Sequence, residues 1–361
     1  MHMPCLDIVI LGLSITSSWG NGHATTYRGL MRELVARGHA VLFLERDVPW
    51  YAAERDLPHP PYGRTMLYTS LNDLKDRFTT AVQQADLVMV GSYVPEGVAL
   101  GAWATQLARG VTAFYDIDTP VTLAKLSSGD HEYLSPELIP CYDLYLSFTR
   151  GSILHRLERD YGAPMARPLY CSVDSALYMP EECEQIYDLG YLGTYSADRH
   201  LRLDRLLLEP ARHWRHGRFI VAGPQYPTDM EWPTNVEHRA HLAPVDHAPF
   251  YNAQRFTLNI TRADMRRSGY APSVRLFEAA ACATPVISDD WEGIDTFFIP
   301  GEEILISQTS RDTLTYLREL SETQRRAIGD RARARMLAEH TAAHRAKTLE
   351  SYVFEARQHR S

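Results

Sequence analysis

Short apolar segments recur along the chain, each followed by a stretch of helical character, and this alternation limits the possible folds more than any other feature. In the first half the apolar segments lie at 6–11, 39–45, 86–90, 111–116, 143–147 and 168–171. Residues 24–38, between the first two, place apolar side chains at helical spacing and end at Gly38. Fully apolar strands that alternate with helices predict a parallel sheet covered on both faces.

The same alternation restarts after a break. Residues 174–186 are polar and lack a period, so we interpret them as an interdomain linker. Apolar segments follow at 187–193, 218–223, 255–261, 284–288 and 303–306, and the tail at 321–357 is helical in character. We therefore predict an α/β protein of two Rossmann-like, doubly wound domains, at 1–180 and 187–335. Two such domains are expected to bind ligands in a cleft at the carboxyl ends of their strands.

Charge and cysteine content exclude several classes of protein. The formal net charge of −8 argues against general nucleic-acid binding, which needs a basic surface. The five cysteines are dispersed without a CxxC pair, which favours free thiols in a reducing compartment. Asp7 interrupts the first apolar segment, so we expect no signal peptide. No run approaches the ~20 apolar residues of a membrane span. We expect a cytoplasmic protein.

The turn after the first predicted strand differs from a dinucleotide-binding turn. Gly20 and Gly22 follow a polar loop and do not form G-x-G-x-x-G, which disfavours a nicotinamide dehydrogenase. One interpretation is a flexible loop that carries His23, at a helix N-terminus, to the ligand-binding edge of the sheet. The alternative is an ordinary turn with an exposed histidine.

The turn at 191–207, "YLGTYSADRHLRLDRLL", has the features of a diphosphate site. Gly193 lets the backbone approach a ligand, Thr194 and Ser196 offer hydroxyl groups, and Arg199 offers a cation. A helix is predicted to begin near Asp198, where free backbone N–H groups favour phosphate. The alternative is a capped helix with a surface arginine.

The segment at 273–290, "SVRLFEAAACATPVISDD", places Glu278 beside a run of small residues. Pro272 and Ser273 are helix-start signals. A carboxylate accepts two hydrogen bonds and can bridge the vicinal hydroxyl groups of a ribose. The first N–H groups of this helix, at Ser273 and Val274, would face phosphate. The alternative is a glutamate that only complements the helix dipole.

Several of these segments together resemble the GT-B glycosyltransferases, and more narrowly the spore-maturation CgeB-like group of predicted glycosyltransferases. The matching segments are 114–123 (FYDIDTPVTL), 191–200 (YLGTYSADRH), 219–227 (FIVAGPQYP), 256–265 (FTLNITRADM), 272–298 (PSVRLFEAAACATPVISDDWEGIDTFF) and 340–353 (HTAAHRAKTLESYV). The resemblance covers most of the chain and is densest from 187 to 300. It implies that residues 336–361 form a terminal helix that packs on the first domain.

The resemblance also implies a function. The protein would transfer a sugar from a nucleotide-diphosphate donor to an unknown acceptor, without a metal or another cofactor. A UDP-sugar is the expected donor. In the first domain, Asp118, Asp116 and His23 fall near the sugar and the acceptor. The nucleobase falls at 241–247. The expected nucleotide-sugar-binding residues are Gly22, Gly193, Thr194, Arg199, Pro244, Ser273, Val274, Arg275 and Glu278.

The sequence departs from the family pattern at two positions. Tyr270 stands where many retaining relatives carry a glutamate, so Asp264 or the backbone at Gly269 would have to replace its sugar contacts. An aspartate also stands in "YDID" where those relatives often have a histidine, so an inverting and a retaining mechanism both stay open. A nucleotide-sugar epimerase or hydrolase, and a non-catalytic assembly protein with the same fold, are the alternatives.

Two further expectations concern metals and the helix at 273–283. The Asp116–Asp118 pair resembles a D-x-D metal motif, but a third oxygen ligand is not apparent. His238, His241 and His247 form an incomplete zinc set and are expected at the surface. Relatives commonly have glycine where this chain has Ala283. Because alanine costs ~1 kcal/mol against glycine in a left-handed conformation, we predict that the helix ends without a left-handed residue there.

Overall fold

The computed structural model describes residues 4–19 and 22–360. The chain divides into two compact units: Met1–Ser172 together with Ala342–Ser361, and Val173–Thr341. The sequence placed the end of the first domain at 180 and the start of the terminal helix at 336. The compact units instead change over after Ser172 and after Thr341.

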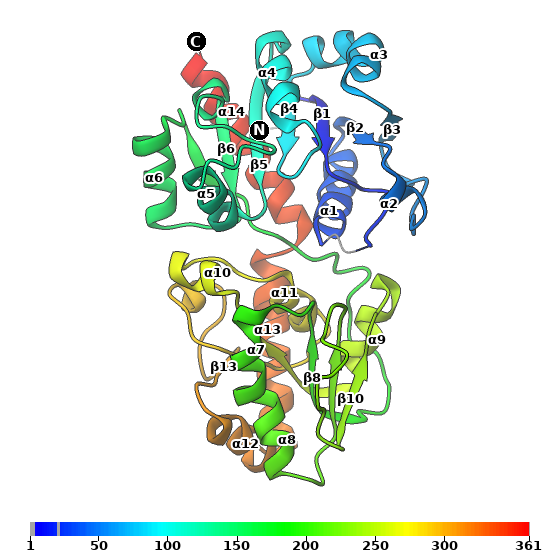
Figure 1. Cartoon of the computed structure of the whole chain (residues 1–361), viewed down its shortest axis with the longest axis vertical. Helices are drawn as coiled ribbons and strands as arrows, with labels where there is room; N and C mark the ends of the chain where they lie inside the picture. The colour runs from blue at the N-terminus through cyan, green and yellow to red at the C-terminus, as the bar shows by residue number, and fades with distance from the viewer. Residues whose placement is uncertain (1–3, 20–21, 361) are drawn as a thin grey trace. The chain divides into compact units, whose positions relative to one another are not determined.

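The first unit is built on a seven-stranded parallel sheet with the order β3-β2-β1-β4-β5-β6-β7 (Figure 1). β1 lies at its centre and pairs with β2 from Asp7 opposite Ala40 and with β4 from Ile8 opposite Leu87. The strands are β1 (Asp7–Gly12), β2 (Ala40–Arg46), β3 (Arg64–Tyr68), β4 (Leu87–Gly91), β5 (Val111–Asp116), β6 (Leu144–Ser147) and β7 (Ala166–Pro168).

Helices cover both faces of this sheet because side chains along each strand alternate between the two faces. On β1, Val9 and Leu11 join the core beneath α3 to α6, whereas Ile8 and Ile10 join the core beneath α1 and α14. The helices of this unit are α1 (His23–Ala36), α2 (Pro49–Ala52), α3 (Leu71–Gln84), α4 (Gly97–Leu107), α5 (Thr119–Ser127), α6 (Ser152–Tyr161) and α14 (Ala342–Arg360), with a 3-10 turn at Ile139–Cys141.

The terminal helix α14 belongs to the first unit, although it follows the second unit in sequence. It lies against α1 and beside β5 and β6 (Figure 1). Its buried Glu350 accepts two hydrogen bonds of 2.6 Å from Arg37 and one of 2.7 Å from His39. The tail that the sequence indicated as helical is interrupted at His340 and Thr341, between α13 and α14.

The second unit is built on a six-stranded parallel sheet with the order β10-β9-β8-β11-β12-β13. The strands are β8 (Tyr187–Leu192), β9 (Phe219–Ala222), β10 (Val236–Arg239), β11 (Gln254–Asn259), β12 (Val286–Ser288) and β13 (Leu305–Ile306). The helices are α7 (Ala197–Leu203), a π-helical segment (Asp204–Leu208), α8 (Glu209–His213), α9 (His247–Asn252), α10 (Ala263–Ser268), α11 (Val274–Ala281), α12 (Ser310–Glu319) and α13 (Glu322–Glu339), with 3-10 turns at Pro244–Asp246 and Ile294–Thr296.

The sequence predicted two doubly wound α/β domains, and the structure confirms this fold class. The sequence prediction missed β3 and β10, which lie at the outer edges of the two sheets. β10 reads Val-Glu-His-Arg, and only Val236 is buried. Edge strands carry polar residues that limit pairing with other chains, so they lack the apolar run that reveals a central strand.

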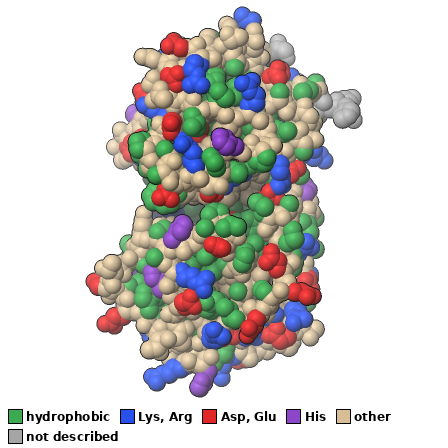
Figure 2. Space-filling view, turned by 90° about the vertical axis from the view of Figure 1, so that its right-hand side faces the viewer, with side chains coloured by type: hydrophobic (Ala, Val, Ile, Leu, Met, Phe, Trp, Pro, Cys, Tyr) green, Lys and Arg blue, Asp and Glu red, His purple; other side chains and the backbone are tan. Residues whose placement is uncertain are grey.

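Each sheet has one position where the strand order reverses, and ligands of doubly wound proteins bind outside the carboxyl ends of the strands there. In the first unit this position lies between β1 and β4, and in the second unit between β8 and β11. On the face drawn in Figure 2, acidic and basic side chains are interspersed over both units. No helix in the described part of the chain combines the length and the apolar character that crossing a membrane requires.

Candidate functional site

The turn after β8 is crowded, and this crowding explains Gly193. A Cβ atom on Gly193 would lie 2.7 Å from the hydroxyl oxygen of Tyr191 and 2.9 Å from a guanidinium nitrogen of Arg275. The turn after β9 packs closely against the turn after β8, since a Cβ atom on Gly223 would lie 2.2 Å from the carbonyl oxygen of Gly193. The backbone of Gly193 thus requires glycine at position 223, whereas a side chain at position 193 would have to displace the ends of the Tyr191 and Arg275 side chains.

Two arginine side chains converge on this turn. Arg199 donates through Nε to Ser196 Oγ at 2.8 Å and through Nη2 to the carbonyl oxygen of Thr194. Arg275 is buried, donates to the carbonyl oxygen of Leu192 and lies with its guanidinium carbon 4.9 Å from the ring centroid of Tyr191. Among the described residues, neither arginine forms an ion pair with a carboxylate.

The electrostatics of this turn favour an anion. Burial lowers the pKa of Arg199, and repulsion from Arg275 and Arg262 lowers it further. Cations held this close without a carboxylate partner gain stabilisation when an anion binds between them. The turn after β8 can therefore hold a phosphate or diphosphate group.

The helix α11 begins as the sequence predicted. Ser273 is its N-cap, and its hydroxyl oxygen accepts a hydrogen bond from the backbone N–H of Arg275. Val274 is the first helical residue, so the N–H groups of the first turn lie next to the Arg275 side chain. This short segment thus brings a cation and free N–H groups to the turn that holds Arg199.

Glu278 is buried in the second turn of α11, with 4% of its surface exposed. One of its carboxylate oxygens accepts a 2.9 Å hydrogen bond from the hydroxyl of Tyr251. Burial raises the pKa of Tyr178, and the charge of Glu278 and a hydrogen bond with it raise it further. Sequence reasoning found Glu278 but missed both tyrosines, because they lie far from it in the chain and carry no motif.

The segment predicted to meet the nucleobase is connected to Glu278. Pro244 begins a 3-10 turn that leads directly into α9, and α9 carries Tyr251. Tyr178 reaches the same helix through a 3.4 Å contact of its hydroxyl with His247. Pro244 and Glu278 are thus brought into one neighbourhood by α9.

The end of α11 contradicts the sequence prediction. Ala283 adopts the left-handed conformation with a φ of 53°. The backbone N–H of Ala283 donates to Ala280, and that of Thr284 to Ala279, each at 3.0 Å. This closure satisfies the last carbonyl groups of the helix, which explains why the left-handed residue forms without glycine.

In the first unit, Asp116 is fully buried at the end of β5. Its carboxylate accepts hydrogen bonds from Tyr145 at 2.5 Å, from Thr122 at 2.8 Å and from the backbone N–H of Asp118 at 3.2 Å. Burial nevertheless raises its pKa to about 6. Asp116 therefore helps to fix the backbone at Asp118 through this last hydrogen bond.

Asp118 and His23 both contact Tyr93. Half-buried Asp118 accepts a 3.2 Å hydrogen bond from the hydroxyl of Tyr93, and the ring of Tyr93 lies 5.4 Å from that of His23. Burial lowers the pKa of His23 to about 3, so its imidazole is neutral near pH 7. The structure thus brings together Asp116, Asp118 and His23, and Tyr93 was not predicted.

The loop that leads to His23 was expected to be flexible, but its first part is firmly held. Glu45 is buried at the end of β2 and accepts hydrogen bonds from Ser14, from the backbone of Ile15 and from Thr16. Gly20 lies outside the described residues. Gly22 is the N-cap of α1 with an ordinary φ of −63°.

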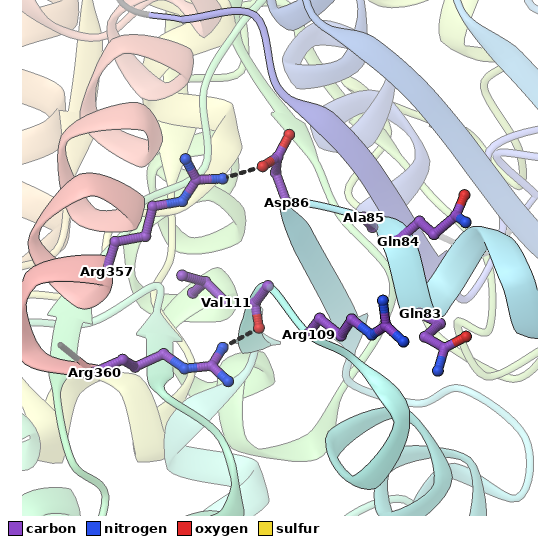
Figure 3. A pocket seen from close by; sticks show the side chains of 9 residues that line it. Gln83, Gln84, Ala85, Asp86, Arg109, Val111, Arg357 and Arg360 are labelled. Atoms are coloured by element: carbon purple, nitrogen blue, oxygen red, sulfur yellow. Dashed lines mark hydrogen bonds and ion pairs between the residues drawn. The ribbon is translucent and has the colours of Figure 1, made fainter.

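The described residues also line two hollows, one in each unit. A pocket of about 550 Å³ lies at the amino edge of the first sheet, where Arg357 contacts Asp86 and Arg360 contacts the carbonyl oxygen of Gly110 (Figure 3). These contacts hold the end of α14 to the sheet. A second hollow of about 280 Å³ includes Tyr195 and His200 in its lining. Among the described residues, no group of three or more His, Cys, Asp or Glu side chains could hold a metal ion.

Comparisons with known proteins agree with this fold. Residues 199–351 match a family model described as "Glycosyl transferase-like", which covers less than half of the chain. The fold is that of the GT-B glycosyltransferases. Among curated proteins, no relative matches the chain.

Three solved structures illustrate the likeness. Sucrose-phosphate synthase from Thermosynechococcus elongatus is 15% identical, with a TM-score of 0.69 over 97% of this chain and 100% of that chain. HepE of Anabaena in complex with UDP-glucose is 12% identical, with a TM-score of 0.71 over 97% and 100%. An alpha-glucosyltransferase in complex with UDP is 10% identical, with a TM-score of 0.72 over 97% and 100%.

Proposed function

We propose that this protein is a glycosyltransferase of the hexosyltransferase type, which transfers a hexose from a UDP-linked donor to an acceptor nucleophile. The observation that carries the proposal is the pair Arg199 and Arg275 at the reversal point of the second sheet. Both lack a carboxylate partner among the described residues, and both lie where a GT-B fold would hold a donor diphosphate. The UDP-containing complexes among the structural neighbours support this choice of donor.

The donor would be bound through its phosphates and its ribose. Arg199, Arg275 and the first N–H groups of α11, including that of Val274, would contact the diphosphate, with Gly193 and Thr194 against it. Glu278 would accept hydrogen bonds from the ribose, and the backbone around Pro244 would face the base. These cations would stabilise the departing UDP without a metal, because they are already oriented where charge develops.

The first unit would supply the acceptor side. During transfer, the bond between the anomeric carbon and the phosphate oxygen breaks, and UDP leaves with the electron pair. The acceptor oxygen bonds to the anomeric carbon and gives up its proton, which Asp118 would accept. Asp116 and Tyr93 would position Asp118. Neutral His23 would hydrogen-bond the sugar or the acceptor. The CgeB-like subgroup and a cytoplasmic location remain part of the proposal.

The experiment that tests the donor site is calorimetric titration of the protein with UDP and UDP-glucose. We expect binding of both, and weaker binding by the Glu278→Gln variant, by about tenfold, since a charge-assisted hydrogen bond contributes about 1.5–3 kcal/mol. Tyr251→Phe is the control, because it removes the same internal hydrogen bond and leaves the carboxylate. Unchanged UDP affinity in Glu278→Gln would overturn the ribose role.

The transfer itself is tested by product analysis. NMR of the protein incubated with UDP-glucose and a panel of sugar, lipid and peptide acceptors should show a new glycosidic linkage, whose anomeric configuration distinguishes inversion from retention. Release of free glucose at one rate with every acceptor, and no new linkage, would favour a hydrolase and contradict the proposal.

A further inference from the structure

The diphosphate turn is only one end of a longer row of arginines between α7 and α10. Arg199, Arg202 and Arg205 are spaced three residues apart, so each arginine is a neighbour of the next along the helix that begins with α7. The start of α10 is fixed to the start of α7, because Asp198 accepts a 2.9 Å hydrogen bond from the backbone N–H of Ala263. Arg262 and Arg266 therefore face this row from the neighbouring segment.

The row falls into two groups with similar charge. The upper group contains Arg199, Arg262 and Arg275, with Asp198 as its carboxylate. The lower group contains Arg202, Arg205 and Arg266, with Asp289 as its carboxylate. Each group holds more positive than negative charge. A donor diphosphate would account for the upper group and leave the lower one with Asp289 as its single negative charge.

Asp289 offsets only one of the three positive charges of the lower group. It is fully buried directly after β12, and one carboxylate oxygen accepts a 3.1 Å hydrogen bond from the backbone N–H of Thr261. The other oxygen lies 3.9 Å from Arg202 Nε and has no hydrogen-bond partner in the described part of the chain. Burial raises the pKa of Asp289 to about 6, so the carboxyl group is mostly ionised at pH 7 and the lower group keeps a net positive charge.

The lower group lies within reach of a sugar bound at the upper group. Helix side chains lean toward the helix N-terminus, so Arg202 points to the carboxyl edge of the sheet, as its approach to Asp289 shows. The helical rise from Arg199 to Arg202 is about 4.5 Å, comparable to the breadth of a hexose ring. A group on the far side of a transferred sugar can therefore meet Arg202 and Arg266 while its diphosphate meets Arg199.

We propose that Arg202 and Arg266 bind a carboxylate on the transferred sugar, so that the preferred donor is a nucleotide-linked uronic acid. This inference rests on the proposed function and specifies its substrate. A planar guanidinium group pairs with a carboxylate through two parallel hydrogen bonds, which a neutral hydroxymethyl group cannot form. The lower arginine group thus serves as the determinant that distinguishes acidic from neutral sugars.

The test is calorimetric titration of the full chain with UDP, UDP-glucose, UDP-galactose, UDP-glucuronic acid and UDP-galacturonic acid. We expect at least one uronic-acid donor to bind about tenfold or more tightly than its neutral counterpart, as a charge-assisted pair would give. The double variant Arg202→Gln, Arg266→Gln should lose this preference and keep its affinity for UDP. Arg267→Gln is the matched control, since Arg267 is exposed on the same helix and pairs with Asp264.

The outcomes separate this inference from the proposed function. UDP binding with equal affinity for acidic and neutral donors would overturn the inference and leave the donor site intact. A uronic-acid preference that persists in the double variant would also overturn it, because the carboxylate would then be recognised elsewhere. Failure of UDP and all four sugars to bind would overturn the UDP-donor proposal and the inference with it.

Discussion

The turns after β5 and β8 carry opposite charges, and these charges have different kinds of hydrogen-bond partner. At the end of β5, Asp116 and Asp118 receive hydrogen bonds from tyrosine and threonine hydroxyls and from backbone N–H groups. At the end of β8, Arg199 and Arg275 donate to backbone carbonyl groups and to neutral side chains. The two units share a fold, so the difference lies in the residues placed at equivalent edges.

This contrast indicates a division of labour. Cations without carboxylate partners fit a substrate that brings its own negative charge, such as a nucleoside diphosphate. Carboxylates held by neutral donors retain the ability to accept a proton or to hydrogen-bond a hydroxyl group. A change in one unit should therefore affect one step and leave the other intact.

The largest effect is expected at the acidic edge. Asp118→Asn keeps the size of the side chain and the Tyr93 contact but removes the proton acceptor. Sugar transfer should fall by about 10²–10⁴-fold, the usual contribution of a general base. UDP affinity, measured by calorimetry, should not change. If turnover fell only slightly, or if UDP binding fell in parallel, Asp118 would not have the assigned role.

A second effect concerns the stability of the first unit against pH. The pKa of Asp116 is raised from 3.8 to about 6, so the folded state holds the proton more tightly than the unfolded state. The stabilisation is complete below pH 3.8 and is lost as the pH rises through 6. The full change corresponds to about 3 kcal/mol.

Chemical denaturation of the wild type and of Asp116→Asn, from pH 4 to pH 7.5, measures this effect. The free energy of unfolding of the wild type should fall relative to the variant as the pH rises. Asp289→Asn tests the same behaviour in the second unit, where burial again raises the carboxyl pKa to about 6. Parallel pH curves for variant and wild type would refute the assignment.

The corresponding experiment in the second unit removes a cation from the turn after β8. Arg199→Gln should weaken UDP binding by about 10–100-fold, since a hydrogen bond to a charged group contributes about 1.5–3 kcal/mol. Transfer at saturating donor should fall less than in Asp118→Asn. Arg212→Gln is the control, because Arg212 lies on α8 and already pairs with a carboxylate, that of Asp204. Equal UDP affinities for the two variants would argue against the phosphate site.

The same contrast shows what the sequence can reveal. Gly193, Arg199 and Glu278 belong to turns and helix starts that local patterns identify, and the alternation of strands and helices indicated the fold class. The partners of these residues come from distant segments. Tyr251 meets Glu278 because helices α9 and α11 pack together, and Tyr145 meets Asp116 because β5 and β6 are neighbouring strands. Asp289 was missed because one aspartate after a strand has no distinguishing pattern.

The smallest expected effect concerns one residue in each unit that has a left-handed backbone conformation. In the first unit, Tyr93 has a φ of 66° and contacts Asp118, so its strain lies at the proposed site. In the second unit, Ala283 has a φ of 53° at the end of α11, before β12 begins. Ala283→Gly should raise the free energy of unfolding by about 1 kcal/mol, because glycine adopts this conformation without the Cβ clash.

Ala281→Gly is the matched control, since it makes the same substitution two residues earlier, at the last residue of α11. There glycine should lower stability by about 1 kcal/mol, because it gains freedom in the unfolded chain and loses a buried methyl group. Denaturation of the two variants should therefore give shifts of opposite sign, with UDP affinity unchanged in Ala283→Gly. Destabilisation by both would mean that the methyl group of Ala283 packs more favourably than its backbone strain costs.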